Sequence, residues 1–135
     1  RTMELRLKKS FNSSLIIAEW ISTIPLVKQV LHPGLTSHPD HLIFKRDFKI
    51  GAGLFAFVLN LKDLEKVDLF IDSLKLFGIG ASWGGFESLI LESDIEKIRF
   101  HQTYNKGTLI RLAIGMEDPE DLIDDLNQAF EQILK

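Results

Sequence analysis

The chain of 135 residues contains no cysteine. This absence excludes a disulfide framework and a thiolate metal site, and nothing in the composition points to an oxidising compartment. A basic patch is also missing: 19 acidic residues outnumber 16 lysines and arginines, and the formal net charge of −3 disfavours a nucleic-acid partner. The apolar runs fall well short of the roughly 20 residues of a membrane span, and no signal peptide is visible. We therefore expect a cytoplasmic protein without membrane contact.

What is present is the composition of an ordinary soluble domain, with 45% hydrophobic and 26% charged residues. A chain of 135 residues predicts one domain, residues 1–135, with a core of its own. The chain opens on Arg1 rather than on a methionine, inside a stretch with helical periodicity. We therefore expect a piece of a longer protein.

Apolar periodicity and turn residues predict an α+β fold. The expected sheet has about four strands, mostly antiparallel, with helices packed on one face and a long helix preceding it. Helices are expected at residues 3–24, 41–48, 64–77 and from 119 to the end, and strands are expected at 26–31, 54–60, 79–83 and 109–114. A turn or short helix is expected at residues 94–99, and a turn is expected at residues 104–107.

Each helix has an apolar stripe that we expect to be buried. Asp63 and Asp118 are the expected N-caps, Gly78 is the expected residue after the second long helix, and Lys45, Arg46 and Asp47 are expected to pair on the surface. The stripes comprise Met3, Leu7, Phe11, Leu15, Ala18 and Ser22, widened by Ile17, Trp20, Ile21 and Ile24; Phe44 and Phe48; Leu64, Val67, Ile71 and Leu74; and Leu122, Leu126, Ala129, Phe130 and Ile133.

Two stretches carry the candidate chemistry. Residues 80–89 place Ser82 and Trp83 before Gly84 and a second glycine, so the backbone can turn sharply or approach a ligand closely. In residues 108–115, Arg111 is the one charged residue of an apolar strand, and a buried guanidinium needs an anion such as a carboxylate. The alternatives are a packed turn with Trp83 in the core, and an edge-strand arginine paired with Glu87 or Glu117. The residues alone predict an anion-binding α+β domain.

Three histidines, His32, His38 and His41, stand in or beside the loop at residues 32–40 and raise the question of a metal site. No acidic or cysteine partner has suitable spacing, so a solvated polar loop is the favoured interpretation and no metal site is expected.

The segments from Ala81 to Ile90 (ASWGGFESLI) and from Gly107 to Ile123 (GTLIRLAIGMEDPEDLI) resemble the C-terminal domain of the Cys/Met-metabolism family of pyridoxal-phosphate (PLP) enzymes. Further matches at Arg1–Met3, His32–Pro33, Phe44–Phe48 and Gly53–Phe55 extend the resemblance over nearly the whole chain. Trp83 is typical of the cystathionine β-lyase branch, because the γ-branch usually has leucine there.

The resemblance implies the small C-terminal domain of a fold-type I enzyme. The large PLP-binding domain and its Schiff-base lysine would then lie outside this chain, and the piece alone would be inactive. It also implies that Arg111 and the backbone N–H of Trp83 bind the substrate α-carboxylate, while Ser82 supports the catalytic lysine. The implied whole protein is a homotetramer that converts L-cystathionine to homocysteine, pyruvate and ammonia.

Ala81 departs from the family pattern, since related β-lyases have tyrosine and γ-lyases have glutamate there. This departure leaves the choice of substrate open between cystathionine and other cysteine conjugates. The alternatives are a cystathionine γ-synthase or methionine γ-lyase of the same family, or a free-standing amino-acid-binding regulatory domain.

Overall fold

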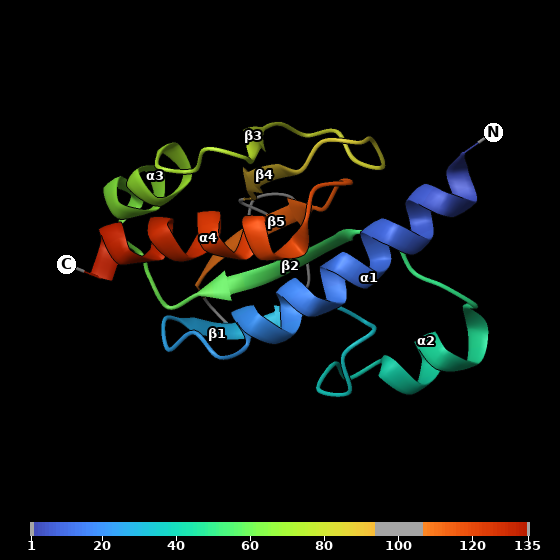
Figure 1. The fold of residues 1–135 in the computed structure, drawn as a ribbon. Helices are drawn as coiled ribbons and strands as arrows, with labels where there is room; N and C mark the ends of the chain where they lie inside the picture. The colour runs from blue at the N-terminus through green and yellow to red at the C-terminus, as the bar shows by residue number, and fades with distance from the viewer. Residues whose placement is uncertain (1, 94–106, 135) are drawn as a thin grey trace.

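The computed structural model describes residues 2–93 and 107–134, so the turns expected at residues 94–99 and 104–106 lie outside the described residues. Within these ranges the chain forms helices and the strands of one sheet (Figure 1). The helices are α1 (Met3–Ile21), α2 (His41–Asp47), α3 (Leu64–Asp72) and α4 (Pro119–Leu134); the strands are β1 (Val27–Leu31), β2 (Leu54–Leu59), β3 (Gly78–Ile79), β4 (Leu89–Glu92) and β5 (Thr108–Ala113).

The strands lie in the order β1-β2-β5-β4-β3, so β5 is the central strand of a five-stranded sheet. Every neighbouring pair is antiparallel except β3 and β4, which run parallel. The α+β class and the mostly antiparallel sheet are therefore confirmed. The expected number of about four strands is one too few, because Leu89–Glu92 forms the strand β4, which was not among the expected strands.

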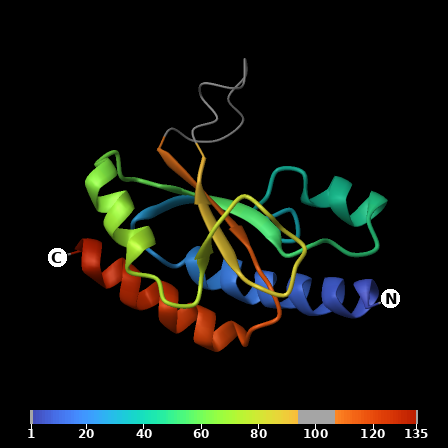
Figure 2. The same ribbon diagram turned by 90° about the horizontal axis from the view of Figure 1, so that it is seen from above.

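Helices α1, α3 and α4 cover one face of the sheet, and α4 packs between the other two (Figures 1 and 2). The core lies between these layers and includes Phe57 of β2, Phe70 of α3 and Phe130 of α4, whose ring centroids lie 4.7–6.3 Å apart. The helix α2 stands apart from this core and contributes no buried residue. Among residues 2–93 and 107–134 no helix covers the other face of the sheet, and the candidate site lies there.

The helix α4 agrees with its sequence pattern throughout. Asp118 Oδ1 accepts a hydrogen bond from the Glu120 N–H at 2.9 Å, and Pro119 is the first helical residue. All five expected stripe residues are buried: Leu122, Leu126, Ala129, Phe130 and Ile133. Asp63 likewise caps α3 by accepting from two backbone N–H groups of the first turn. The regular 3.6-residue period and the capping aspartates explain why the first residues of α3 and α4 were predicted correctly.

The expected buried face of α1 is wrong in its first half. Met3 is 66% exposed, and the helix instead buries Ser10, Ser13 and Ser14. Burial of Ser14 is inexpensive because its hydroxyl donates to the Phe11 carbonyl of the same helix at 2.7 Å. The helix also ends at Ile21, three residues before the expected end.

Other expected boundaries and faces need correction around α2, α3 and β3. Phe48 and Leu64, both expected to be buried, are 60% exposed. Gly78 does not follow a helix but begins β3, because α3 ends at Asp72. The expected surface pairing at residues 45–47 is confirmed in part, since Arg46 and Asp47 form an exposed bidentate ion pair.

A carboxylate of α4 holds the connection from α3 to β3. Asp125 is only 5% exposed and accepts hydrogen bonds from the backbone N–H groups of Lys75, at 2.9 Å, and Leu76, at 2.7 Å. Gln128 donates to the Ser73 carbonyl at 2.6 Å in the same connection. The Asp125 acceptors and the Gln128 donor satisfy backbone groups that have no helical partner after Asp72, which allows the helix to end there.

Candidate functional site

Arg111 lies in the middle of the central strand, on the face of the sheet without helices. Its neighbours Ile110 and Leu112 are fully buried in the core beneath the helices. Because side chains alternate along a strand, Arg111 faces the opposite side. Its cross-strand partners are Ala56 of β2 and Leu91 of β4. The side chain of Arg111 therefore extends from an apolar part of the central strand. The alternative that placed this arginine on an edge strand is wrong.

The guanidinium of Arg111 is held by backbone carbonyls rather than by a carboxylate. Its Nη2 donates to the carbonyl oxygens of Gly80, at 3.0 Å, and Ser82, at 3.3 Å. Among the described residues neither Glu87 nor Glu117 forms an ion pair with it. Its Nε is buried and has no hydrogen-bond partner there. A buried N–H of a cation without an acceptor is costly, so the site has an unused donor suited to an anion.

The segment Gly80–Ser88, which we call the β3–β4 loop, brings the other predicted site residues beside Arg111. Ala81 and Ser82 are exposed, and Trp83 is 63% exposed. The alternative that placed Trp83 in the core is therefore wrong. Gly84 has a φ of +75°, a backbone conformation that residues with a side chain rarely adopt, so a glycine at this position allows the turn after Trp83.

The end of the β3–β4 loop is fixed by a glutamate that the sequence analysis considered only as a partner of Arg111. The two carboxylate oxygens of Glu117 accept from the backbone N–H and the hydroxyl of Ser88, each at 2.8 Å. The Ser88 hydroxyl in turn accepts from the Gly115 N–H at 2.9 Å. No local pattern could reveal this contact, because the two residues lie 29 positions apart on separate elements.

A hollow of about 240 Å³ adjoins the tip of the loop. It is lined by Trp83 and Gly84, by the first turns of α1 including Arg6, and by the end of β5 at Ala113. Because its lining includes both Ala113, which shares a face of β5 with Arg111, and residues of α1, the hollow lies at the end of the sheet between the β3–β4 loop and the start of α1.

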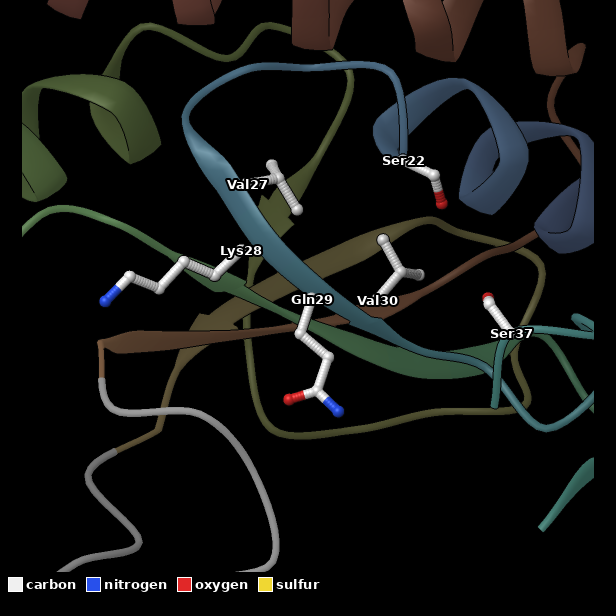
Figure 3. Close-up of a pocket in the computed structure, with 6 residues that line it drawn as sticks. All are labelled: Ser22, Val27, Lys28, Gln29, Val30 and Ser37. Atoms are coloured by element: carbon white, nitrogen blue, oxygen red, sulfur yellow. The ribbon is translucent and has the colours of Figure 1, made fainter. Parts of the chain in front are cut away.

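A second hollow, of about 290 Å³, lies beside the edge strand β1 and is separate from Arg111 (Figure 3). The side chains of Lys28 and Gln29 extend away from the hydroxyls of Ser22 and Ser37, so the polar groups do not converge on one point (Figure 3). A binding site requires convergent polar groups. We therefore place the candidate site at Arg111 and the β3–β4 loop.

The loop histidines bind backbone groups. His32 Nδ1 accepts from the Gly34 N–H at 3.0 Å, His38 Nδ1 accepts from the Asp40 N–H at 3.1 Å, and His41 Nδ1 lies 3.0 Å from the Pro33 carbonyl oxygen. In the part of the chain that the structure describes, no three histidine, aspartate or glutamate side chains are arranged to hold a metal ion. No described helix has the length and apolarity that crossing a membrane requires.

Comparison with known proteins gives one consistent family. The model of the Cys/Met metabolism PLP-dependent enzymes matches residues 1–131. Cystathionine β-lyase of Escherichia coli K12 is 43% identical, and the match covers 99% of this chain and 35% of the length of that enzyme. An L-alanine/L-glutamate racemase of Wolbachia pipientis is 39% identical, and the match covers 98% of this chain and 34% of the length of the racemase. The solved structure of a methionine γ-lyase from Micromonospora echinospora matches with a TM-score of 0.81 and 28% identity, over 96% of the chain and 33% of its own. The chain thus spans about a third of the length of the relatives it matches.

Proposed function

Since the chain belongs to the Cys/Met metabolism PLP-dependent enzymes, we propose that it is the substrate-binding C-terminal domain of a larger carbon–sulfur lyase. In this proposal residues 1–135 form the small domain, and the large domain supplies the cofactor site and its lysine. The proposed reaction is that of a cystathionine β-lyase, with L-cystathionine as substrate and homocysteine, pyruvate and ammonia as products. The whole protein is proposed to be a homotetramer.

The observation that carries the proposal is the unused donor of Arg111. Its Nη2 is occupied by the Gly80 and Ser82 carbonyls, which fix the plane of the guanidinium, while the buried Nε has no acceptor among the described residues. A substrate carboxylate is an anion that accepts charge-assisted hydrogen bonds, and a guanidinium N–H is a strong donor to it. A carboxylate at Nε would satisfy the buried donor and add charge complementarity.

The loop adds two further groups at this place. The backbone N–H of Trp83 is proposed to donate to the same carboxylate, and the Ser82 hydroxyl is proposed to support the catalytic lysine of the large domain. The hydrogen bond from Arg111 to the Ser82 carbonyl, with Trp83 as the next residue, supports the proposal that these three residues act together. Fixing the carboxylate fixes the orientation of the substrate Cα, which decides which of its bonds reacts.

The cofactor fits this arrangement as a neighbour rather than as a ligand of this chain. PLP, when bound by the large domain, supplies an electron sink for loss of the Cα proton. We assign no residue of residues 1–135 to holding it. The contribution of this chain is to bind and orient the amino acid through Arg111, Trp83 and Ser82.

The first test is Arg111→Ala in the full-length protein. Loss of a charge-assisted hydrogen bond to the carboxylate costs about 1.5–3 kcal/mol, so kcat/KM should fall about 10- to 150-fold while PLP absorbance is retained. Arg111→Lys is the matched variant that keeps the charge but loses the planar fork, and it should recover only part of the loss. Unchanged kinetics in both variants would overturn the carboxylate role.

The product distinguishes the members of the family. β-Elimination releases pyruvate, whereas the γ-elimination expected of a methionine γ-lyase releases 2-oxobutyrate. A keto-acid assay of the full-length protein with L-cystathionine and with L-methionine therefore separates the two. Pyruvate from cystathionine supports the proposal, and 2-oxobutyrate alone would replace it by the γ-lyase function.

A second function is favoured by Ala81 together with the Wolbachia relative, which is named an L-alanine/L-glutamate racemase. Ala81 has the smallest side chain that keeps a Cβ, and it lies exposed beside the Ser82 carbonyl that binds Arg111. A racemase needs the same carboxylate anchor but no leaving group on the substrate side chain. Formation of D-alanine or D-glutamate from the L-isomer, without keto acid, would identify this activity.

A further inference from the structure

The segment from Arg111 to Glu117 holds the β3–β4 loop at two separate places. At the start of the loop, Arg111 Nη2 donates to the carbonyls of Gly80 and Ser82. At the end of the loop, the Glu117 carboxylate accepts both donors of Ser88. The first contact belongs to the carboxylate site described above. The second lies outside it and has no role in the proposed function.

The tip of the loop has little packing of its own. A Cβ built on Gly84 or Gly85 would meet nothing within 4 Å. Trp83 and Phe86 are 63% and 72% exposed. A segment with few packed contacts takes its position from its ends, because nothing else opposes its motion.

The end of the loop is, in contrast, closely packed. Ser88 is fully buried, and the Met116 N–H donates to the Phe86 carbonyl at 2.8 Å. A Cβ at Gly115 would overlap the Phe86 carbonyl oxygen and would lie 2.6 Å from Glu117 Oε2. The turn after β5 and the end of the loop therefore fit together without room for a side chain.

We propose that Glu117 is a positioning residue, which acts through Ser88 to hold the β3–β4 loop in register with Arg111. The inference rests on the proposed function for its kinetic consequence. A carboxylate suits this task because each of its two oxygens accepts one donor of Ser88. An amide offers one acceptor oxygen and a nitrogen that only donates, so Glu117→Gln removes the arrangement in which each Ser88 donor has its own oxygen.

The experiment uses the full-length protein labelled with 5-fluorotryptophan. The Trp83 resonance is assigned by its loss in Trp83→Phe and then compared between the parent and Glu117→Gln. We expect the Trp83 resonance to shift or broaden and KM for the amino-acid substrate to rise about tenfold, with kcat changed less than about threefold. In the double variant Glu117→Gln/Ser88→Ala the rise in KM should be no larger than in the worse single variant, because both act through one contact.

Two controls separate positioning from general stability. Glu120→Gln makes the same change three residues further along, in the exposed first turn of α4, and should leave the resonance and KM unaltered. Ser14→Ala removes the buried hydrogen bond between Ser14 and His32, in which no residue of the loop takes part, and should lower the unfolding temperature without a specific rise in KM. An unchanged Trp83 resonance in Glu117→Gln, or equal kinetic changes in Ser14→Ala at equal loss of stability, would overturn the inference.

A failure of the positioning role of Glu117 can be distinguished from a failure of the proposed function. If Arg111→Ala leaves KM unchanged, the carboxylate role is wrong, yet the Trp83 resonance still decides whether Glu117 positions the loop. If Arg111→Ala raises KM and Glu117→Gln changes neither KM nor the resonance, the proposed function stands and the positioning role is refuted.

Discussion

Acidification should destabilise this chain through one buried histidine, His32, which is 1% exposed. Its Nδ1 accepts from the Gly34 N–H, so the proton of the neutral ring is on Nε2, which lies 2.9 Å from Ser14 Oγ. The Ser14 hydroxyl in turn donates to the Phe11 carbonyl. The neutral ring is therefore fully satisfied, and a second proton on Nδ1 would face the Gly34 N–H.

Burial lowers the pKa of His32 from 6.5 to about 4, with a smaller contribution in the same direction from the charge of His38. Between these two values the unfolded chain binds a proton that the folded chain does not bind. Stability from this group is therefore complete above about pH 6.5 and is lost as the pH falls towards 4. The difference of the two pKa values corresponds to at most about 3 kcal/mol.

The assay is urea unfolding of the 135-residue chain between pH 7 and pH 4, compared with His32→Asn. Asparagine retains an acceptor near the Nδ1 position but does not titrate, so the stability difference between the two proteins should shrink by up to about 3 kcal/mol on acidification. A difference that stays constant from pH 7 to pH 4 would refute the reasoning.

Two further predictions concern the body of the domain. Asp125→Ala should lower the free energy of unfolding by about 2–3 kcal/mol in urea titration, because two backbone N–H groups of the α3–β3 connection lose their acceptor, whereas Asp124→Ala at an exposed neighbouring position should cost little. The isolated chain should self-associate through exposed apolar side chains of α1 and α2, such as Leu5 (70% exposed) and Leu42 (78% exposed). Sedimentation should show oligomers that Leu5→Lys with Leu42→Lys reduces, and a clean monomer of the parent at high concentration would contradict this.

Where one local rule dominates, the sequence predicts the structure well. The helix α4 has a capping aspartate, a first-position proline and five apolar residues at helical spacing, and all five are buried. The strands β2 and β5 follow from their apolar runs and form the middle of the sheet. Arg111 stood out because a single charge in such a run is costly, and it does lie on the central strand.

The errors occur where contacts distant in sequence decide the outcome. The buried face of α1 contains serines whose hydroxyls bond their own helix, and a hydrophobic pattern does not count them. The end of α3 depends on Asp125, about 50 residues later. The role of Glu117 depends on Ser88. Such contacts become visible only when the elements are placed in space.

Our central claim is that this chain serves a PLP-dependent lyase as its substrate-binding domain. The most direct test is the intact mass of the protein from its native source, measured together with its visible absorbance. We predict a mass well above 15.4 kDa, the mass of this chain, and a yellow chromophore that borohydride reduces onto the protein. A colourless native protein of 15.4 kDa would contradict the claim and favour a free-standing amino-acid-binding domain.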